Sequence, residues 1–404
     1  MTGAEKMNCR ICKTPVQQFL SLGTLPLGNA FLRAPEEFDQ EPRFPLTLGF
    51  CPACALVQQM TPPPMELLKS DYRQYRYVPV GDSLRGHLAA LGREVAEGLK
   101  PESLVVDIGS NDGALLASIK DRCQVLGIEP AEEISEQAKQ AGVPTLTAFF
   151  DEELAERIVR AYGHADVVTC TQTLQHIPDL SGFLAGVRTL LKPEGMFIVE
   201  GRYFPATMRQ CTYDTIYHEM LVYFSLHSLK ALLERHGLVV FKAERTPTYG
   251  GSLRVYAQYE GQGDSSVSAI LENEWDRGVD RLVPYLEFAN RVEKMGRELQ
   301  ELVVGLKAKG ARIAGYGAPS TSTTLLGFCG IGADMVEYIV DDNPLKQGLF
   351  HPGTHIPIVS AQALEQKPPT HLLVLAHQFE NLIMERTKLL GAKYILPVPP
   401  RVVG

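Results

Sequence analysis

The stretch "SLVVDIGSNDGALL", residues 103–116, joins a short apolar strand to a tight turn and the start of a helix. Asp107 lies near the end of the strand, Gly109 begins the turn, and Gly113 precedes the helix. Glycines in such a turn allow a ligand to approach the backbone closely. Ligands of open α/β sheets bind at the carboxyl ends of the strands. The stretch therefore predicts a ligand-binding α/β domain.

The same loop favours S-adenosylmethionine over a dinucleotide. The G-x-G-x-x-G fingerprint is absent, and the acids Asp107 and Asp112 would repel a pyrophosphate but attract the sulfonium and amino end of a cationic cofactor. Glu129, at the end of the next strand, can accept hydrogen bonds from both ribose hydroxyls. The alternative is a flavodoxin-like domain without a nucleotide. The predicted cofactor-binding residues are Asp107, Gly109, Ser110, Asn111, Asp112, Gly113, Glu129, Pro130, Phe149 and Gln172.

Apolar runs alternate with helical stretches from residue 101 to about residue 260, which is typical of a doubly wound parallel sheet. The predicted strands are 103–109, 123–130, 165–174 and 196–201, and 252–259 is predicted as a late edge strand. A polar helical stretch follows at 267–309. A second, smaller Rossmann-like unit is predicted from residue 311 onward.

Two C-x2-C pairs, Cys9/Cys12 and Cys51/Cys54, predict a tetrahedral zinc site. A divalent cation offsets the mutual repulsion of four thiolates. Four protein ligands leave no open coordination position, so we expect a structural zinc, with a nucleic-acid-binding or redox site as the alternative. The gap between the pairs leaves room for a small folded insert, and the other four cysteines are expected to be reduced and packed.

Composition and charge narrow the possible function. The chain has 404 residues and a net charge of −8, and its basic residues are scattered, which opposes a general nucleic-acid-binding role. The first residues show no signal-peptide pattern, and no apolar run reaches about 18 residues, so we expect a cytoplasmic protein without a membrane span.

These features predict an α/β protein of four segments. A zinc-binding module covers 1–66 and ends at the prolines of "TPPPME". A class I, Rossmann-like methyltransferase domain covers 67–265, with a helical entry at 67–100 that includes an amphipathic helix over roughly 82–98. A helical connector covers 266–310. A smaller Rossmann-like domain for substrate or nucleotide binding covers 311–404.

The C-terminal unit contains the glycine-rich, hydroxyl-rich loop "GYGAPSTSTTLL", residues 315–326. A neutral loop before a helix suits phosphate groups, although such a loop can also serve packing alone. Asp341 or Asp342, at the end of the next strand, could hold a sugar hydroxyl. The predicted substrate-binding residues are Tyr72, Tyr77, Gly317, Ala318, Pro319, Ser320, Asp341 and Lys346.

The stretch "DTIYHEMLVYFSL", residues 214–226, places a phenol, an imidazole and a carboxylate side by side at Tyr217, His218 and Glu219. Such groups perform general acid and base catalysis, whereas the thioether of the following Met220 cannot act as a base. Tyr249 could donate a hydrogen bond to an oxyanion. These four side chains are the predicted catalytic residues, although each could also be a buried structural residue.

Taken in order, the CxxC pairs, "VVDIGSNDGALL", "IYHEMLVYFSLHSL", "YGGSLRVY" and "GYGAPSTSTTLL" resemble the three-domain sugar C-methyltransferases that use S-adenosylmethionine. The resemblance spans essentially the whole chain. It implies methylation at C3 of a dTDP-4-keto deoxysugar: a base removes the C3 proton, the enolate attacks the methyl group, and the configuration inverts. It also implies a role in deoxysugar or antibiotic biosynthesis for a monomer or small homo-oligomer whose partner is a small-molecule nucleotide-linked sugar.

Four positions depart from the family pattern. The family's YHEH motif ends here in Met220, its HGGSLR begins here with Tyr249, its GAPAKGNTLL is here "GAPSTSTTLL", and its WNF is here "AHQF", with His377. The lost histidines leave two alternatives open. One is a methyltransferase with a changed acceptor, either a hydroxyl or a more acidic carbon of a natural-product intermediate. The other is an inactive S-adenosylmethionine-binding homologue.

Overall fold

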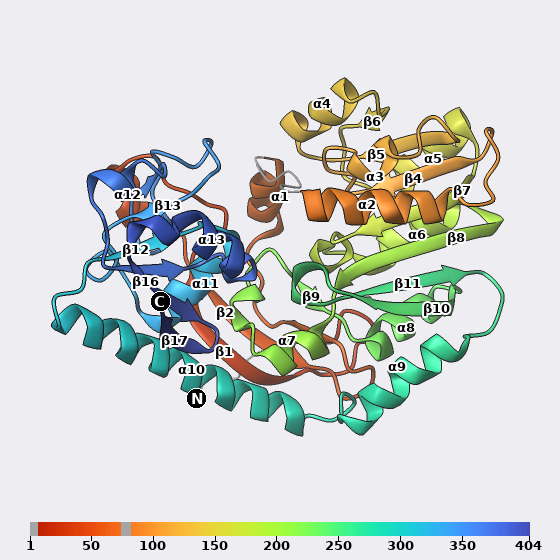
Figure 1. The fold of residues 1–404 in the computed structure, drawn as a ribbon. Coiled ribbons are helices and arrows are strands. Elements are labelled where there is room, and N and C mark those ends of the chain that lie inside the picture. The colour runs from red at the N-terminus through yellow and green to blue at the C-terminus, as the bar shows by residue number, and fades with distance from the viewer. Residues whose placement is uncertain (1–6, 74–81) are drawn as a thin grey trace.

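The computed structural model describes residues 7–73 and 82–404 and contains three β-sheets of four, seven and six strands (Figure 1). The predicted substrate residue Tyr77 lies outside the described residues. The large sheet belongs to the central domain, the six-stranded sheet to the C-terminal domain, and the four-stranded sheet begins in the N-terminal module. The predicted α/β architecture with an N-terminal zinc-binding module and two Rossmann-like units is confirmed.

The four-stranded sheet joins the N-terminal module to the central domain. Its order is β1 (Gln17–Leu25), β2 (Phe44–Phe50), β3 (Val57–Gln59) and β9 (Val222–Tyr223), and all pairs are antiparallel. Strand β9 lies within the stretch 214–226, shortly after the predicted catalytic residues, and its Tyr223 pairs with Val57 of β3. The backbone of the catalytic stretch is therefore fixed against the N-terminal module.

The seven-stranded sheet forms the core of the central domain. Its order is β10 (Val239–Thr246), β11 (Ser252–Gln258), β8 (Leu191–Arg202), β7 (Ala165–Thr171), β4 (Leu104–Ile108), β5 (Gln124–Ile128) and β6 (Thr145–Leu146). All five residues of β4 are buried, as expected for a strand covered on both faces. The five strands from β8 to β6 are parallel, and β11 is antiparallel to both of its neighbours.

The prediction of 252–259 as an edge strand was wrong. Strand β11 lies between β10 and β8, because the stretch 239–246 forms a further strand on its outer side. The helices of this domain are α1 (Met65–Arg73), α2 (Asp82–Val95), α3 (Ala114–Ala117), α4 (Glu132–Gln140), α5 (Glu152–Tyr162), α6 (Leu180–Leu190), α7 (Phe204–Gln210) and α8 (Leu226–Arg235). Figure 1 shows α2 alongside the large sheet.

The C-terminal domain is a smaller parallel sheet with helices. Its strand order is β14 (Ile358–Val359), β13 (Ile339–Val340), β12 (Ile313–Tyr316), β15 (His371–Val374), β16 (Lys393–Pro397) and β17 (Pro400–Val403), and only the last pair is antiparallel. Its helices are α11 (Ser320–Cys329), α12 (Ala363–Gln366) and α13 (Glu380–Thr387). Helix α11 begins within the predicted hydroxyl-rich loop.

The predicted helical connector contains two helices, α9 (Ser265–Asp276) and α10 (Val283–Ala308). In Figure 1, α10 runs beneath both β1 and the C-terminal domain. Its buried Phe288, Val292 and Leu299 share one apolar cluster with residues of β1 and α11. The helix is therefore part of a common core that fixes the N-terminal module against the C-terminal domain.

Polar contacts hold the segment before the predicted catalytic residues against the C-terminal domain. His377 Nε2 donates to Oδ2 of the buried Asp214 at 2.8 Å, and Thr324 Oγ1 donates to the carbonyl of Ile216 at 2.7 Å. Burial lowers the pKa of His377, but the charge and hydrogen bond of Asp214, together with the charge of Glu380, outweigh burial and raise this pKa overall. His377, one of the departures from the family pattern, thus contributes to the interface between the two domains.

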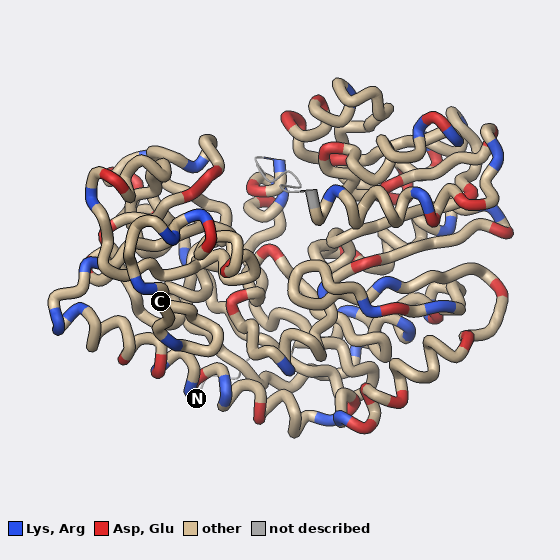
Figure 2. Tube along the Cα trace, in the orientation of Figure 1, with Lys and Arg blue, Asp and Glu red and all other residues tan. Residues whose placement is uncertain are grey.

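The charged side chains are distributed over the whole molecule. Figure 2 shows Lys and Arg interspersed with Asp and Glu along the described chain. Among the helices within residues 7–73 and 82–404, none is both long and apolar enough to cross a membrane. The basic residues that are scattered in the sequence thus remain scattered after folding.

Candidate active site and metal centre

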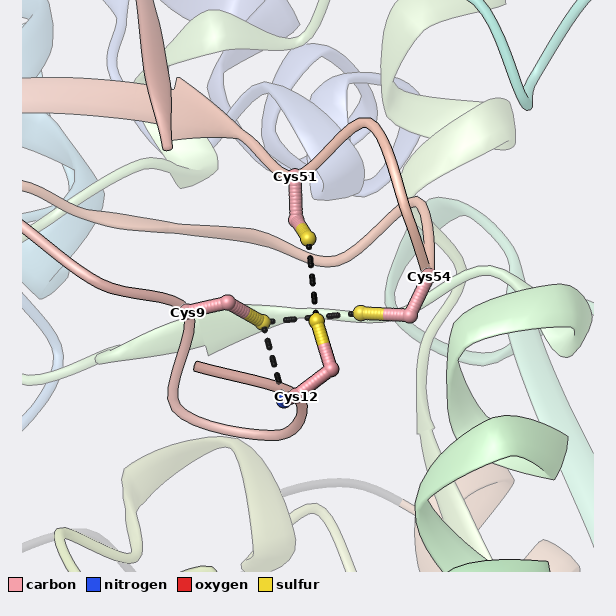
Figure 3. Close-up of side chains that lie close together, drawn as sticks. All are labelled: Cys9, Cys12, Cys51 and Cys54. Atoms are coloured by element: carbon pink, nitrogen blue, oxygen red, sulfur yellow. Dashed lines mark hydrogen bonds between the residues drawn. The ribbon is translucent and has the colours of Figure 1, made fainter. Parts of the chain in front are cut away.

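The four predicted zinc ligands come together at one point (Figure 3). The sulfur atoms of Cys9, Cys12, Cys51 and Cys54 all lie within 4.8 Å of one another, with 3.5 Å between Cys9 and Cys54 and 3.3 Å between Cys12 and Cys51. Sulfurs in a tetrahedral zinc site lie about 3.8 Å apart, given a Zn–S bond of about 2.3 Å. The donor set fits a closed structural zinc with four thiolate ligands.

The glycine turn after β4 has a conformation that only glycine accepts easily. Gly109 has a φ of +77°, and a Cβ built at this position would lie 2.1 Å from Thr173 Oγ1. The backbone N–H groups of Gly109 and Ser110 both donate to the carbonyl of Ile128, at 2.8 and 3.1 Å. The turn is therefore packed tightly between the ends of β4, β5 and β7.

Two of the three predicted cofactor acids line the cavity at this edge of the sheet. Asp107 Oδ1 accepts from Thr169 Oγ1 at 2.7 Å, and burial raises the pKa of Asp107 to about 7. Glu129 accepts from the backbone N–H groups of Asn111 and Ala131, at 3.1 and 2.9 Å, and burial raises its pKa as well. A bound cation near such buried carboxyl groups favours their ionised forms.

The third acid, Asp112, forms an ion pair and a hydrogen bond at the start of α3. Its Oδ2 pairs with Arg85 at 2.6 Å, and its Oδ1 accepts from the N–H of Ala114 at the start of α3. Asp112 is not among the described residues that line the cavity, and its place near the amino end of the cofactor stays a prediction. The sequence gives no sign of this pairing, because Arg85 lies 27 residues before Asp112, on α2.

The cavity lies where the N-terminal module, the central domain and the C-terminal domain meet. Asn29 contributes from the N-terminal module and Ser320 from the start of α11. The predicted residues that line it are Tyr72, Asp107, Gly109, Ser110, Asn111, Glu129, Pro130, Gln172, Tyr217, Glu219, Tyr249 and Ser320. The wall also includes Leu84, His87, Leu88, Leu115, Thr171, Thr173, His176 and Glu200, none of which the sequence singled out.

Glu219 is a buried carboxyl group with one oxygen held and one oxygen unpaired. Its Oε1 accepts from both the backbone N–H and the Nδ2 of Asn29, each at 3.1 Å. Its Oε2 is buried and has no hydrogen-bond partner among the residues that the structure describes. Burial and the nearby Asp71 carboxyl raise the pKa of Glu219 to about 8. Glu219 can therefore exchange a proton at Oε2 near neutral pH.

His218 and Met220 point away from this cavity. His218 Nε2 donates to the carbonyl of Phe44 at 3.0 Å, and burial lowers the pKa of the imidazole. Met220 is fully buried in an apolar cluster. His218 thus serves as a packed, hydrogen-bonded residue beside β2. Residues 218 and 219 form a turn, closed by the N–H of Met220 donating to the carbonyl of Tyr217 at 3.1 Å, and Tyr217 and Glu219 line the cavity.

Gln59, at the end of β3, holds the backbone of this turn. Its Nε2 lies 3.1, 2.8 and 2.7 Å from the carbonyl oxygens of Tyr217, His218 and Met220. The sequence reasoning missed Gln59 because it lies outside the predicted motifs.

Tyr249 lines the cavity in an unusual backbone conformation. Its φ is +52°, which is uncommon for a residue with a side chain. Arg202 donates to the carbonyl of Tyr249 at 3.1 Å, and its guanidinium lies 5.2 Å from the centre of the tyrosine ring. Arg202 therefore holds both the backbone and the ring of Tyr249.

His176 is a cavity residue that the sequence reasoning missed. Its Nδ1 donates to the carbonyl of Glu219, and the hydroxyl of Tyr72 donates to the same oxygen at 3.2 Å. Burial lowers the pKa of His176 to about 4, so the imidazole is neutral at pH 7. The sequence could have indicated His176, because it follows shortly after β7, and ligands bind at the carboxyl ends of the strands of such a sheet.

Most of the predicted substrate residues in the C-terminal domain support the loop instead of lining the cavity. Asp341 Oδ2 accepts from the N–H of Ala318 at 2.6 Å, and Lys346 Nζ donates to the carbonyl of Ala318 at 2.8 Å. A Cβ at Gly317 would lie 2.5 Å from the Cβ of Ala376. The predicted residues outside the cavity wall, among those described, are Asp112, Gly113, Phe149, His218, Gly317, Ala318, Pro319, Asp341 and Lys346.

Replacing Gly109 by alanine is expected to weaken S-adenosylhomocysteine binding at least tenfold and to destabilise the fold by about 2 kcal/mol or more, because the new Cβ meets Thr173. Isothermal titration calorimetry and chemical denaturation measure the two effects. Gly163→Ala is the matched control, since Gly163 also has a positive φ, +85°, but nothing lies within 4 Å of its Cβ. Equal ligand affinity in the two variants would contradict the assignment of this turn to the cofactor.

Comparison with known families covers nearly the whole chain. Residues 9–68 match a zinc binding domain, residues 82–243 a methyltransferase domain, and residues 247–399 a C-methyltransferase C-terminal domain. The chain is 34% identical to the C-methyltransferase NovU of Streptomyces niveus, over 98% of this chain and 96% of that protein.

More distant matches cover only part of the chain. A ubiquinone biosynthesis O-methyltransferase of Neisseria meningitidis is 33% identical over 23% of this chain and 41% of its own length. Magnesium protoporphyrin IX methyltransferase from Synechocystis, solved with bound S-adenosylhomocysteine, is 18% identical with a TM-score of 0.34, covering 48% of this chain and 93% of that one. The family matches and the full-length similarity to NovU show that this chain belongs to the C-methyltransferase family and is an S-adenosylmethionine-dependent enzyme with a zinc-binding N-terminal module.

Proposed function

We propose that this enzyme methylates the carbon next to the carbonyl of a nucleotide-linked keto-deoxysugar, with Glu219 as the general base. The observation that carries the proposal is the buried Oε2 of Glu219, which has no hydrogen-bond partner among the described residues and belongs to a side chain in the cavity wall. Asp107 and Glu129 line the same cavity, so the base and the predicted cofactor acids share one space.

Bound S-adenosylmethionine supplies an electrophilic methyl group in this cavity. Glu219 Oε2 accepts the proton from the carbon next to the carbonyl, and the electrons of the broken C–H bond move into an enolate. The enolate carbon would form the new C–C bond as the methyl–sulfur bond of the cofactor breaks, with S-adenosylhomocysteine as the second product; Asp107 and Glu129 would hold the cofactor in this cavity. Tyr217 and Tyr249 line the cavity, and their phenols can donate to the enolate oxygen, where such donors have their largest effect.

The C-terminal domain supports the choice of a nucleotide-linked acceptor. Ser320, at the start of α11, lines the cavity, so an acceptor seated near Glu219 can extend toward this Rossmann-like domain. The chain would then act in four segments, 1–66, 67–265, 266–310 and 311–404, with the last one binding the nucleotide. A deoxysugar pathway fits this reading.

The test uses the purified, zinc-loaded enzyme with S-adenosylmethionine and a panel of dTDP-, UDP- and GDP-linked 4-keto-6-deoxysugars. We expect turnover with a dTDP-linked sugar and a product whose new carbon resonance is that of a C-methyl group. A thermal-shift screen with the same nucleotides, in the presence of S-adenosylhomocysteine, should show a dTDP-selective increase in Tm. An O-methyl resonance, or no response to any nucleotide sugar in either assay, would overturn the proposed acceptor.

A further inference from the structure

The carboxylate of Glu219 is held by a residue that lies far away in the sequence. Asn29, in the zinc-binding module, donates to Oε1 from both its backbone N–H and its side-chain Nδ2, across a separation of 190 residues. Both donors approach the same oxygen. They therefore fix the plane of the carboxyl group and leave Oε2 as the oxygen that can exchange a proton.

The C-terminal domain in turn holds Asn29. Ser320 Oγ donates to Asn29 Oδ1 at 2.6 Å, which leaves Nδ2 of the amide to donate to Glu219. The backbone beside Asn29 comes very close to α11, since a Cβ on Gly28 would lie 2.9 Å from the Cβ of Ser320. The side-chain amide of Asn29 is thus held at both polar atoms: Oδ1 accepts from Ser320, and Nδ2 donates to Glu219.

We propose that Asn29 is the positioning residue for Glu219, and that Ser320 couples the C-terminal domain to the base by fixing the orientation of the Asn29 amide. This inference rests on the proposed role of Glu219 as the base. Two N–H donors favour the ionised form of a carboxyl group, so Asn29 opposes the effects of burial and keeps Glu219 able to accept a proton. Asn29 itself touches no reacting atom in this scheme.

Other titratable groups surround Glu219 and contribute to its proton affinity. Asp71 and Tyr72 face it from α1, His176 from the short helix Leu174–His176, and Tyr217 and Tyr223 from its own stretch. Of these, Asp71 is the one whose charge raises the pKa of Glu219. The backbone N–H and Nδ2 of Asn29 both donate to Oε1 of Glu219, so Asn29→Ala removes the side-chain hydrogen bond and keeps the backbone one.

The test is an infrared pH titration of the zinc-loaded full chain without substrate. The C=O stretch of the protonated Glu219 carboxyl group is isolated by subtracting the spectra of Glu219→Gln in each background. We expect Asn29→Ala to raise the titration midpoint of this band by about one pH unit, because one hydrogen bond to the ionised form is lost. Ser320→Ala should raise it by a smaller amount, since the donors remain but the amide is no longer fixed.

Asn290→Ala is the matched control, because Asn290 lies exposed on α10, and its midpoint should equal that of the wild type. An unchanged midpoint in Asn29→Ala would overturn the positioning role. A shift in Asn29→Ala with none in Ser320→Ala would overturn the coupling to the C-terminal domain. The readout does not depend on the acceptor, so a failed search for a ketosugar substrate counts against the proposed function and leaves this test intact.

Discussion

Replacing Glu219 by glutamine is expected to lower kcat for methyl transfer by about 10²- to 10⁴-fold, the usual contribution of a general base. Glutamine keeps the shape of the side chain and can still accept hydrogen bonds from Asn29, but it cannot take up a proton. The affinity for S-adenosylhomocysteine should stay within about twofold of the wild-type value, because the hydrogen bonds that hold Asp107 and Glu129 do not involve Glu219.

A proton-exchange assay separates loss of the base from loss of methyl transfer. In D2O with S-adenosylhomocysteine bound, the wild-type enzyme should exchange the C–H proton of the ketosugar without forming product, and Glu219→Gln should not. Glu274→Gln is the matched control: Glu274 is equally buried and accepts from the backbone N–H groups of Leu226 and His227, but it does not line the described cavity wall. Wild-type exchange in Glu219→Gln would remove Glu219 from the role of base.

The fold could be predicted well because its signals are local. The apolar run of β4 with its glycine turn, the strand and helix alternation, and the two CxxC pairs each depend on neighbouring residues. The error at β11 arose because the sequence "VVFKAERT" of β10 has few apolar residues in its second half. A strand at the outer edge of a sheet needs fewer apolar residues, and so it gives a weaker pattern.

The site was only partly predictable, because side-chain direction is set by tertiary contacts. Asp107 and Glu129 follow strands, and their place at the sheet edge could be inferred. Glu219 faces the cavity and His218 does not, and this depends on Gln59. Gln59, at the end of β3, binds the carbonyls of His218 and Met220. Asn29 lies in the insert between the two CxxC pairs, and no local sequence pattern marks it as a contact of Glu219.

Removing the zinc is expected to abolish methyl transfer while cofactor binding survives. A structural zinc site contributes about 10–16 kcal/mol of binding energy, which exceeds the net stability of most small domains, so the N-terminal module should unfold without it. That module supplies Asn29 and Gln59, and its strand β3 pairs with β9. Loss of the module therefore releases Glu219 and the whole stretch around it.

The experiment compares chelator-treated wild type and Cys51→Ser with untreated enzyme. A zinc-sensitive dye measures the metal, circular dichroism the unfolding, calorimetry the binding of S-adenosylhomocysteine, and a product assay the rate. Cys123→Ser is the matched control, because Cys123 is buried in the central domain and is not one of the four clustered cysteines. A zinc-free enzyme with wild-type turnover would contradict the dependence of the active site on this module.

Methyl transfer and cofactor binding should respond differently to zinc loss, because different parts of the chain hold Glu219 and the two cofactor acids. Asp107 accepts a hydrogen bond from Thr169, and Glu129 accepts from Asn111 and Ala131, all within the central domain. Those to Glu219 Oε1 come from Asn29, in the zinc-binding module. Zinc loss should therefore change kcat by orders of magnitude and the dissociation constant of S-adenosylhomocysteine by little. A parallel loss of both would instead mean that the module and the central domain unfold as one cooperative unit.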